Sequence, residues 1–212
     1  MTRVVVRAAG AAMACLAVLA LTACDPSQPG AAAIVGDQRI TETELQDSVR
    51  AIVDLKLEAG QKAGDVAALT REELAERIES LLVTRAAAAE GVAVTEGEVR
   101  SYVSGARSDF GDEKRFRAAL ANSNVAPDDL ERYTEFFLLR EKLANELGGA
   151  NDPATAEKYN QLILRIGNEA GVQVSPRYGS WDAVKGIGGP PDDLSRSESG
   201  DQPPTEPAPN PQ

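Results

Sequence analysis

The stretch AAIVGDQRITETEL, residues 32–45, decides how the folded part of the chain begins. Its first half places β-prone residues on both sides of Gly36 and Asp37, a pair typical of the tight turn of a hairpin. Its second half matches a capping box: the Thr41 hydroxyl accepts from the N–H of Glu44, whose carboxylate accepts from the N–H of Thr41. We therefore expect a small β-hairpin that leads directly into a helix.

Helix start and stop signals recur along the chain. Thr70 and Thr95 each stand three residues before a glutamate, as in a capping box, and Pro127 and Pro153 suit the first position of a helix. Apolar residues between these signals recur every three or four positions, as in amphipathic helices. Expected helix ends fall at Gly60, Gly91, Gly111, Gly148-Gly149 and Gly171. The sequence thus predicts a mainly α fold, a multi-helix bundle.

The later part of the chain predicts how this bundle closes. The stretch 127–147 is apolar on more than one side, which favours a central helix or one that covers a groove. The helix expected over 153–170 is followed by Val172-Gln173-Val174, which alternates as a strand does. We expect this short strand to pair with the N-terminal hairpin and so join the two ends of the folded region. Tyr178 and Trp181 are expected to pack the C-terminal segment onto the bundle.

The N-terminus has the pattern of an export signal. Residues 1–7 carry Arg3 and Arg7 without an acidic residue, and residues 8–21 are apolar but too short to span a bilayer comfortably. The run closes on Leu21-Thr22-Ala23-Cys24, which resembles the lipobox of bacterial lipoproteins. We therefore expect cleavage before Cys24 and lipid attachment to its thiol, since two or more acyl chains hold a protein durably on a membrane.

The amino-acid composition limits the domain organisation, the binding partners and the kinds of catalytic site that the chain can have. The 212-residue chain has a net charge of −11, which disfavours binding to nucleic acid. It contains no histidine, and its two cysteines both lie within the first 24 residues, so the usual Ser-His-Asp, Cys-His and zinc sites are excluded. We predict no catalytic residue, metal or cofactor. The predicted parts are a signal peptide (1–23), a lipidated tether (24–32), a helical domain (33–183) and a disordered acidic, Pro-rich tail (184–212).

Both ends of the helical domain resemble a known family. Val35-Gly36 and Ile40-Thr41 stand where SurA/PrsA-type extracytoplasmic folding factors carry a V-N-G-x-x-I-T-x-x-E-L stretch at the start of their N-terminal chaperone domain. Residues 172–179, VQVSPRYG, resemble the V-x-V-N-P-R-Y-G ending of related lipoprotein foldases. The resemblance covers about residues 32–182. It implies a chaperone domain that binds unfolded or newly exported polypeptides.

One part of the family pattern is missing from this chain. Members with prolyl isomerase activity insert a parvulin domain before the last helix of the chaperone domain, and parvulin sites typically use two histidines. Here residues 148–152, GGAND, are too few to hold a domain, and the chain has no histidine. We therefore expect an ATP-independent holdase on the membrane without isomerase activity. The alternative is a structural or adaptor lipoprotein that docks one specific envelope or secretion partner.

Aromatic side chains are the candidates for client binding. Exposed in a groove they would hold unfolded segments, whereas in the alternative interpretation they form the core. Adjacent positions of a helix cannot both face one side, so either Phe136 or Phe137 is expected to be exposed. The acidic pairs Glu72-Glu73 and Asp128-Asp129 are interpreted as first-turn residues that interact with helix dipoles rather than as catalytic carboxylates. The five candidates are Phe110, Phe116, Tyr133, Phe136 and Phe137.

Overall fold

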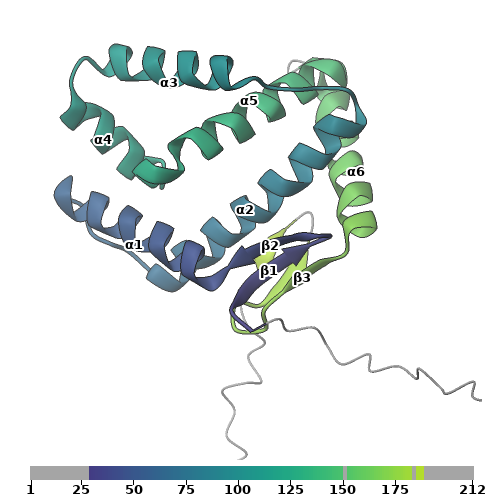
Figure 1. The fold of residues 1–212 in the computed structure, drawn as a ribbon, viewed down its shortest axis with the longest axis horizontal. Helices are drawn as coiled ribbons and strands as arrows, with labels where there is room; N and C mark the ends of the chain where they lie inside the picture. The colour runs from purple at the N-terminus through teal and green to yellow at the C-terminus, as the bar shows by residue number, and fades with distance from the viewer. Residues whose placement is uncertain (1–28, 150–151, 183–184, 189–212) are drawn as a thin grey trace, which may run out of the picture.

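The computed structural model describes residues 29–149, 152–182 and 185–188, and this part of the chain is mainly helical (Figure 1). The helices are α1 (Glu42–Glu58), α2 (Val66–Ala89), α3 (Glu96–Phe110), α4 (Glu113–Asn122), the short 3-10 helix η1 (Pro127–Asp129), α5 (Leu130–Glu146) and α6 (Pro153–Ala170). The strands are β1 (Ala31–Val35), β2 (Gln38–Thr41), β3 (Val172–Val174), β4 (Ser180–Asp182) and β5 (Gly186–Gly188). The prediction of a mainly α fold with a small sheet is confirmed.

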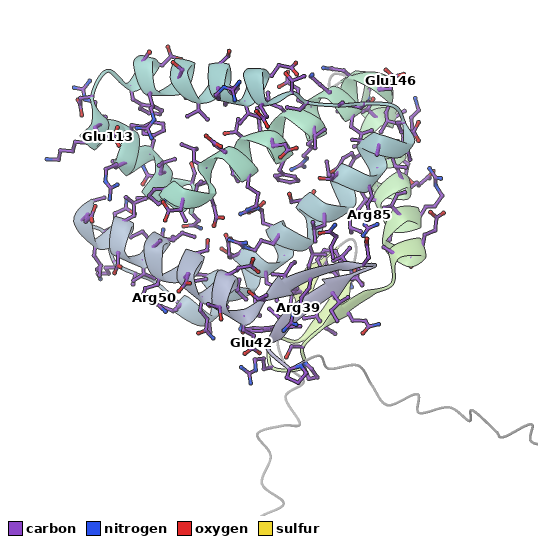
Figure 2. All side chains as sticks on the ribbon, in the orientation of Figure 1. Arg39, Glu42, Arg50, Arg85, Glu113 and Glu146 are labelled. Carbon is purple, nitrogen blue, oxygen red and sulfur yellow. The ribbon has the colours of Figure 1, made fainter. Side chains whose placement is uncertain are left out.

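The predicted hairpin forms, and helix α2 holds its turn. Strands β1 and β2 pair antiparallel on either side of Gly36, which has a φ of 63°. Arg85 of α2 donates to the carbonyl of Val35 at 2.9 Å and forms an ion pair with Asp37 (Figure 2). A Cβ at position 36 would lie 2.8 Å from Arg85 Nη2, the far end of a flexible side chain, so it is the positive φ that favours glycine here.

The two ends of the folded region pair with each other, as predicted. Strand β3 runs antiparallel to β1, giving the sheet order β2-β1-β3. The N–H of Ser175 continues this pairing by donating to the carbonyl of Ala32 at 2.9 Å. Arg177 then forms an ion pair with Glu42 at the start of α1, at 3.0 Å, and Tyr178 is buried. The C-terminal segment therefore locks onto the first hairpin and the first helix.

Folded chain extends past the predicted domain boundary at residue 183. Strand β5 pairs with β4 in a second, two-stranded sheet, with Trp181 opposite Ile187. Both of these side chains pack against the main core, which accounts for the ordering of a stretch expected in the tail. The predicted signal peptide, the tether as far as residue 28 and residues 189–212 lie outside the described residues.

Side-chain caps explain most helix starts and correct one prediction. Thr41 and Thr95 form complete capping boxes with Glu44 and Glu98, as expected. The box predicted at Thr70 is wrong, because α2 begins earlier, at Val66. Asp65 caps it by accepting from the N–H groups of the second and third helical residues. Thr70 lies inside the helix and donates its hydroxyl hydrogen to the Val66 carbonyl.

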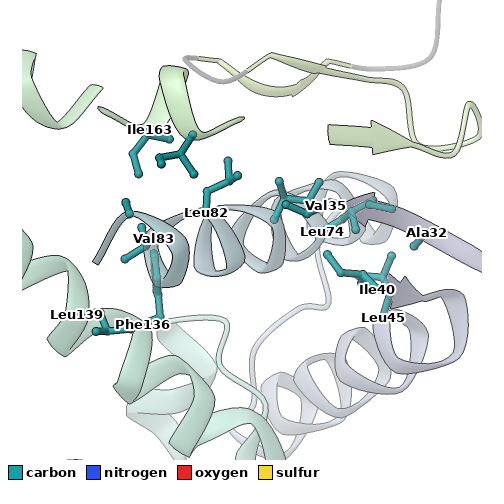
Figure 3. Close-up of a cluster of buried hydrophobic side chains, with 14 of the residues drawn as sticks. Ala32, Val35, Ile40, Leu45, Leu74, Leu82, Val83, Phe136, Leu139 and Ile163 are labelled. Carbon is teal, nitrogen blue, oxygen red and sulfur yellow. The ribbon is translucent and has the colours of Figure 1, made fainter. Parts of the chain in front are cut away.

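The helix predicted to begin at Pro127 also starts differently. Pro127 opens the three-residue 3-10 helix η1, and the α-helix α5 begins only at Leu130. The main core lies where α2 meets α1, α5, α6 and the three-stranded sheet. Figure 3 shows part of this core, with Leu82 and Val83 of α2 between Ile163 of α6 and Phe136 of α5. Burying several such side chains stabilises the fold by roughly 1.5–3 kcal/mol each.

A second, smaller apolar cluster lies at the far end of α1. Leu55 packs there with Phe116 and Leu120 of α4, and Tyr133 of α5 lies against it. The rings of Tyr133 and Phe136 meet edge to face with centroids 6.3 Å apart. Because Phe136 belongs to the main core, this ring contact connects the two clusters.

An ion network joins the helices between these clusters. Arg77 of α2 donates to Glu73 at 2.7 Å and to Asp129 of η1 at 2.5 Å. The Ser48 hydroxyl of α1 lies within hydrogen-bond distance of the same two carboxylates, at 3.0 and 2.5 Å, and shares its one hydrogen between them. Arg132 of α5 lies 3.4 Å from each of them. Interpreting Glu73 as a first-turn residue was therefore wrong: it lies within α2 and is buried.

The network yields a stability prediction. We expect Arg77→Met to lower the free energy of unfolding by about 3–5 kcal/mol, because Glu73 and Asp129 would lose a cation that compensates their burial. Urea unfolding followed by circular dichroism measures the change. Arg50→Met is the matched control: it removes an exposed pair with Asp47 and should cost less than about 1 kcal/mol. Similar losses in the two variants would contradict a structural role for the network.

Candidate functional site

The five predicted aromatic side chains divide between core and surface. Phe116 and Phe136 are buried, with 3% and 6% of their surface exposed. Tyr133 is half-buried, whereas Phe110 and Phe137 are each 40% exposed. Of the adjacent pair on α5, Phe136 faces the core and Phe137 faces outward. Neither interpretation of the aromatics therefore holds for all five residues.

Helix α3 leaves the two aromatic rings of its apolar stripe exposed, whereas Val103 and Ala106 are half-buried. Tyr102, Val103, Ala106 and Phe110 recur at helical spacing, yet Val99 is the only buried residue of this helix. Tyr102 is 45% exposed. An amphipathic helix normally buries such a stripe, so its exposed rings form a candidate interaction surface. Tyr102 was not among the five aromatic residues predicted for client binding.

Ring contacts extend the exposed stripe onto neighbouring helices. The Tyr102 and Phe137 rings lie 5.6 Å apart between centroids, and those of Phe110 and Phe116 lie 5.9 Å apart. The guanidinium of Arg107 lies 4.5 Å from the centre of the Phe116 ring. We call Tyr102, Phe110 and Phe137 the aromatic face. It offers flat apolar contacts without a fixed hydrogen-bond pattern, which suits unfolded segments of varied sequence.

Lys142 anchors the start of α3 on α5. Lys142 of α5 lies 2.5 Å from Glu98 and donates to the Ala93 carbonyl at 2.9 Å. The hydrogen bond from Lys142, with those from Thr95, lowers the pKa of Glu98 to about 2. The Glu98 carboxylate therefore caps α3 and ties it to α5 throughout the neutral range. This anchor acts at the first turn of α3, while the exposed stripe lies further along.

A pocket of about 820 Å³ opens at the seam between α2, α5, α6 and the β4–β5 hairpin. Its apolar lining includes Tyr159, Ile163 and Trp181, and its acidic lining includes Glu72 and Glu79 of α2. Burial raises the pKa of Tyr159, and the Glu79 carboxylate, which accepts from its hydroxyl at 3.0 Å, raises it further. Sequence analysis missed this pocket because its lining comes from elements far apart in the chain.

Several searched features lie elsewhere or are not found. Cys24, the predicted lipidation site, lies outside the described residues. Within residues 29–149, 152–182 and 185–188, no group of three or more His, Cys, Asp or Glu side chains is placed to hold a metal ion. No helix in this described part is long and apolar enough to cross a bilayer.

Comparison with known proteins identifies the domain. Residues 4–144 match the SurA-like N-terminal domain. The chain belongs to this family. The matched range ends within α5, so α6 and strands β3–β5 follow it. No parvulin domain is detected, and no curated protein or solved structure gives a significant match.

Membership of the SurA-like family has two general functional implications. The family is extracytoplasmic, and its N-terminal domain implies binding of client polypeptides in general. Within this SurA-like domain, the aromatic face is the accessible apolar surface that involves predicted site residues. It also includes two of the five large hydrophobic side chains predicted for client binding, Phe110 and Phe137.

The contrast between Phe136 and Phe137 can be tested directly. We expect Phe136→Ala to lower the free energy of unfolding by about 3–5 kcal/mol, because it leaves a cavity in the core. Phe137→Ala removes an exposed ring and one ring contact, and should cost at most about 1 kcal/mol. Urea unfolding of both variants under the same conditions gives the comparison. A larger loss for Phe137→Ala would show that the aromatic face is part of the core.

Proposed function

We propose that this SurA-like protein is a membrane-anchored, ATP-independent holdase for exported polypeptides, without prolyl isomerase activity. The exposure of the two α3 rings, Tyr102 and Phe110, is the observation that carries the proposal. Client segments bind at the aromatic face through apolar and ring contacts. They are released when the free client concentration falls or when folding buries the bound segment.

The arrangement of α3 supports reversible binding. A surface formed by a few exposed rings buries a modest area, so each segment is held weakly and exchanges quickly. The main core does not involve α3, so contacts between the aromatic face and a client leave the packing of α2 against its neighbours intact. A holdase needs this combination of a stable frame and an accessible, sequence-tolerant surface.

Membrane attachment is the second part of the proposal. It is supported by the lipobox-like Leu21-Thr22-Ala23-Cys24 and by the extracytoplasmic location of the family. A diacylated Cys24 would hold the domain close to the point where polypeptides leave the membrane. Tethering raises the effective concentration of the aromatic face near emerging clients, which compensates for weak individual contacts.

The holdase proposal predicts loss of function when the aromatic face is made polar. We expect Tyr102→Ser/Phe137→Ser to need about tenfold more protein to half-suppress aggregation of a reduced model client, because two aromatic anchors are lost. Light scattering during client aggregation measures this effect. The matched control is Leu57→Ser, which alters an exposed apolar residue at the end of α1 and should retain suppression.

Two outcomes would contradict the holdase. Wild-type protein that fails to suppress aggregation in stoichiometric excess would exclude it. Retention of one stoichiometric partner in pull-downs from membranes would then favour the adaptor function. Equal suppression by the double variant and the wild type would show that the aromatic face is not where clients bind.

The anchor proposal is tested at its cysteine. We expect Cys24→Ser to lose incorporation of labelled palmitate and to move from the membrane fraction to the soluble fraction of the producing cells, because no acyl chain is attached. Cys15→Ser changes the other cysteine of the chain and should leave both properties unchanged. Membrane retention of the Cys24→Ser protein would overturn lipid anchoring at this residue.

A further inference from the structure

The pocket at the seam of α2, α5 and α6 combines negative charge with aromatic walls. Glu72 and Glu79 lie on the same face of α2, seven residues and therefore about two helical turns apart. Glu72 is exposed and makes no hydrogen bond or ion pair with any residue that the structure describes. Asp152 adds a third carboxylate at the start of α6.

Glu76 lies between these acids but is already paired. Arg132 donates to both of its carboxylate oxygens, at 3.0 and 3.3 Å, from the side of the ion network. Burial raises the pKa of Glu76, and the hydrogen bonds from Arg132 oppose that rise. Arg140 is the cation in the pocket lining. Its one positive charge is outnumbered by the negative charges of Glu72, Glu79 and Asp152. The pocket lining therefore has an excess of negative charge.

The apolar part of the lining suits a side chain with a flat or aliphatic stem. Tyr159 and Trp181 present aromatic rings, and Ile163 and Ala75 add aliphatic surface. Arg140 lies 5.5 Å from the centre of the Tyr159 ring, an example of a guanidinium beside an aromatic ring of this wall. A basic side chain can therefore rest its stem or its guanidinium on the rings while its charge meets the carboxylates.

One residue of the pocket lining has a polar atom without a partner. Thr155 lines the pocket and is buried, with 4% of its surface exposed, and its hydroxyl has no hydrogen-bond partner among the described residues. A buried hydroxyl without a partner costs about 1–3 kcal/mol. This oxygen is itself buried and lies 3.0 Å from where a Cβ on Gly148 would stand, so it packs under the loop before α6 and does not face the pocket interior.

The pocket adjoins the aromatic face along α5. Phe137 precedes Arg140 by three residues, so the two side chains lie on the same side of the helix, one turn apart. An extended polypeptide advances about 3.3 Å per residue, so a few residues separate a ring placed on Phe137 from a side chain in the pocket.

We propose that the pocket binds a lysine or arginine side chain of a polypeptide whose neighbouring apolar segment occupies the aromatic face. This inference rests on the proposed holdase function and specifies which clients bind best: those in which a basic residue lies a few positions from an aromatic one. Charge complementarity favours this occupant, since the pocket excludes acidic segments by repulsion and offers neutral ones no charge-assisted hydrogen bond.

The test compares two labelled peptides that differ by one charge. Each is a short serine- and glycine-rich peptide with one phenylalanine, a neutral fluorophore and, a few residues from the ring, either arginine or its uncharged isostere citrulline. Fluorescence anisotropy with the full chain carrying Cys24→Ser measures both dissociation constants. We expect at least about tenfold tighter binding of the arginine peptide at low salt, with a difference that shrinks as salt is added.

Matched variants locate the preference. Glu72→Gln/Glu79→Gln removes two charges and retains the oxygen that accepts from Tyr159, and it should reduce the arginine preference to less than about threefold. Glu146→Gln removes a charge at the end of α5, outside the pocket lining, and should keep the preference (Figure 2). Circular dichroism and urea unfolding confirm that the variants are folded.

Each of the remaining outcomes contradicts either the pocket inference or the proposed holdase function. Equal binding of the two peptides, with client aggregation still suppressed, overturns the pocket inference and leaves the holdase. An arginine preference that survives in Glu72→Gln/Glu79→Gln places the basic side chain elsewhere and also overturns it. Binding of arginine methyl ester as tightly as the peptide would make the pocket a small-cation site rather than a polypeptide subsite. Failure of both peptides and of suppression overturns the proposed function.

Discussion

The ion network around Arg77 is the constraint on which the arrangement of the helices depends. Buried carboxylates are tolerated only with their cations in place, so α1, α2, η1 and α5 must meet where Ser48, Arg77 and Arg132 can all reach Glu73 and Asp129. Helix α5 in turn positions α3, through Lys142 and the contact of Tyr102 with Phe137. Arg132 also holds Glu76 in the lining of the acidic pocket. The aromatic face and the pocket therefore share one frame.

Local sequence signals predicted the helices and strands well, because each signal depends on interactions between neighbouring residues. A Gly-Asp turn, two capping boxes and the glycines after helices each depend on a few neighbouring residues, and all are present in the structure. The error at Thr70 arose where two local signals competed, since Asp65 caps the helix five residues earlier. Glu73 was misinterpreted for a related reason: once the start of α2 moves back, the same residue lies within the helix and among its buried side chains.

The site was only partly predictable because exposure depends on partners from other elements. Helical geometry required Phe136 and Phe137 to face different sides, but only the packing of α5 against α2 decides which one is buried. The apolar spacing of α3 is that of an ordinary amphipathic helix, and nothing in its own sequence indicates that its neighbours leave Tyr102 and Phe110 exposed. The pocket brings together Glu79, Tyr159 and Trp181, three residues that no sequence motif connects.

The weak burial of α3 is consistent with a division of stability across the domain. Helix α2 buries nine residues and α3 buries one, so opening of α3 exposes little additional apolar surface and disturbs little of the main core. A client that covers Tyr102 and Phe137 replaces water at rings that are already exposed. Binding therefore gains apolar burial without first breaking a packed interface. A helix fully buried in the core would have to lose its packing contacts before each client could bind. That requirement would be incompatible with rapid, reversible binding.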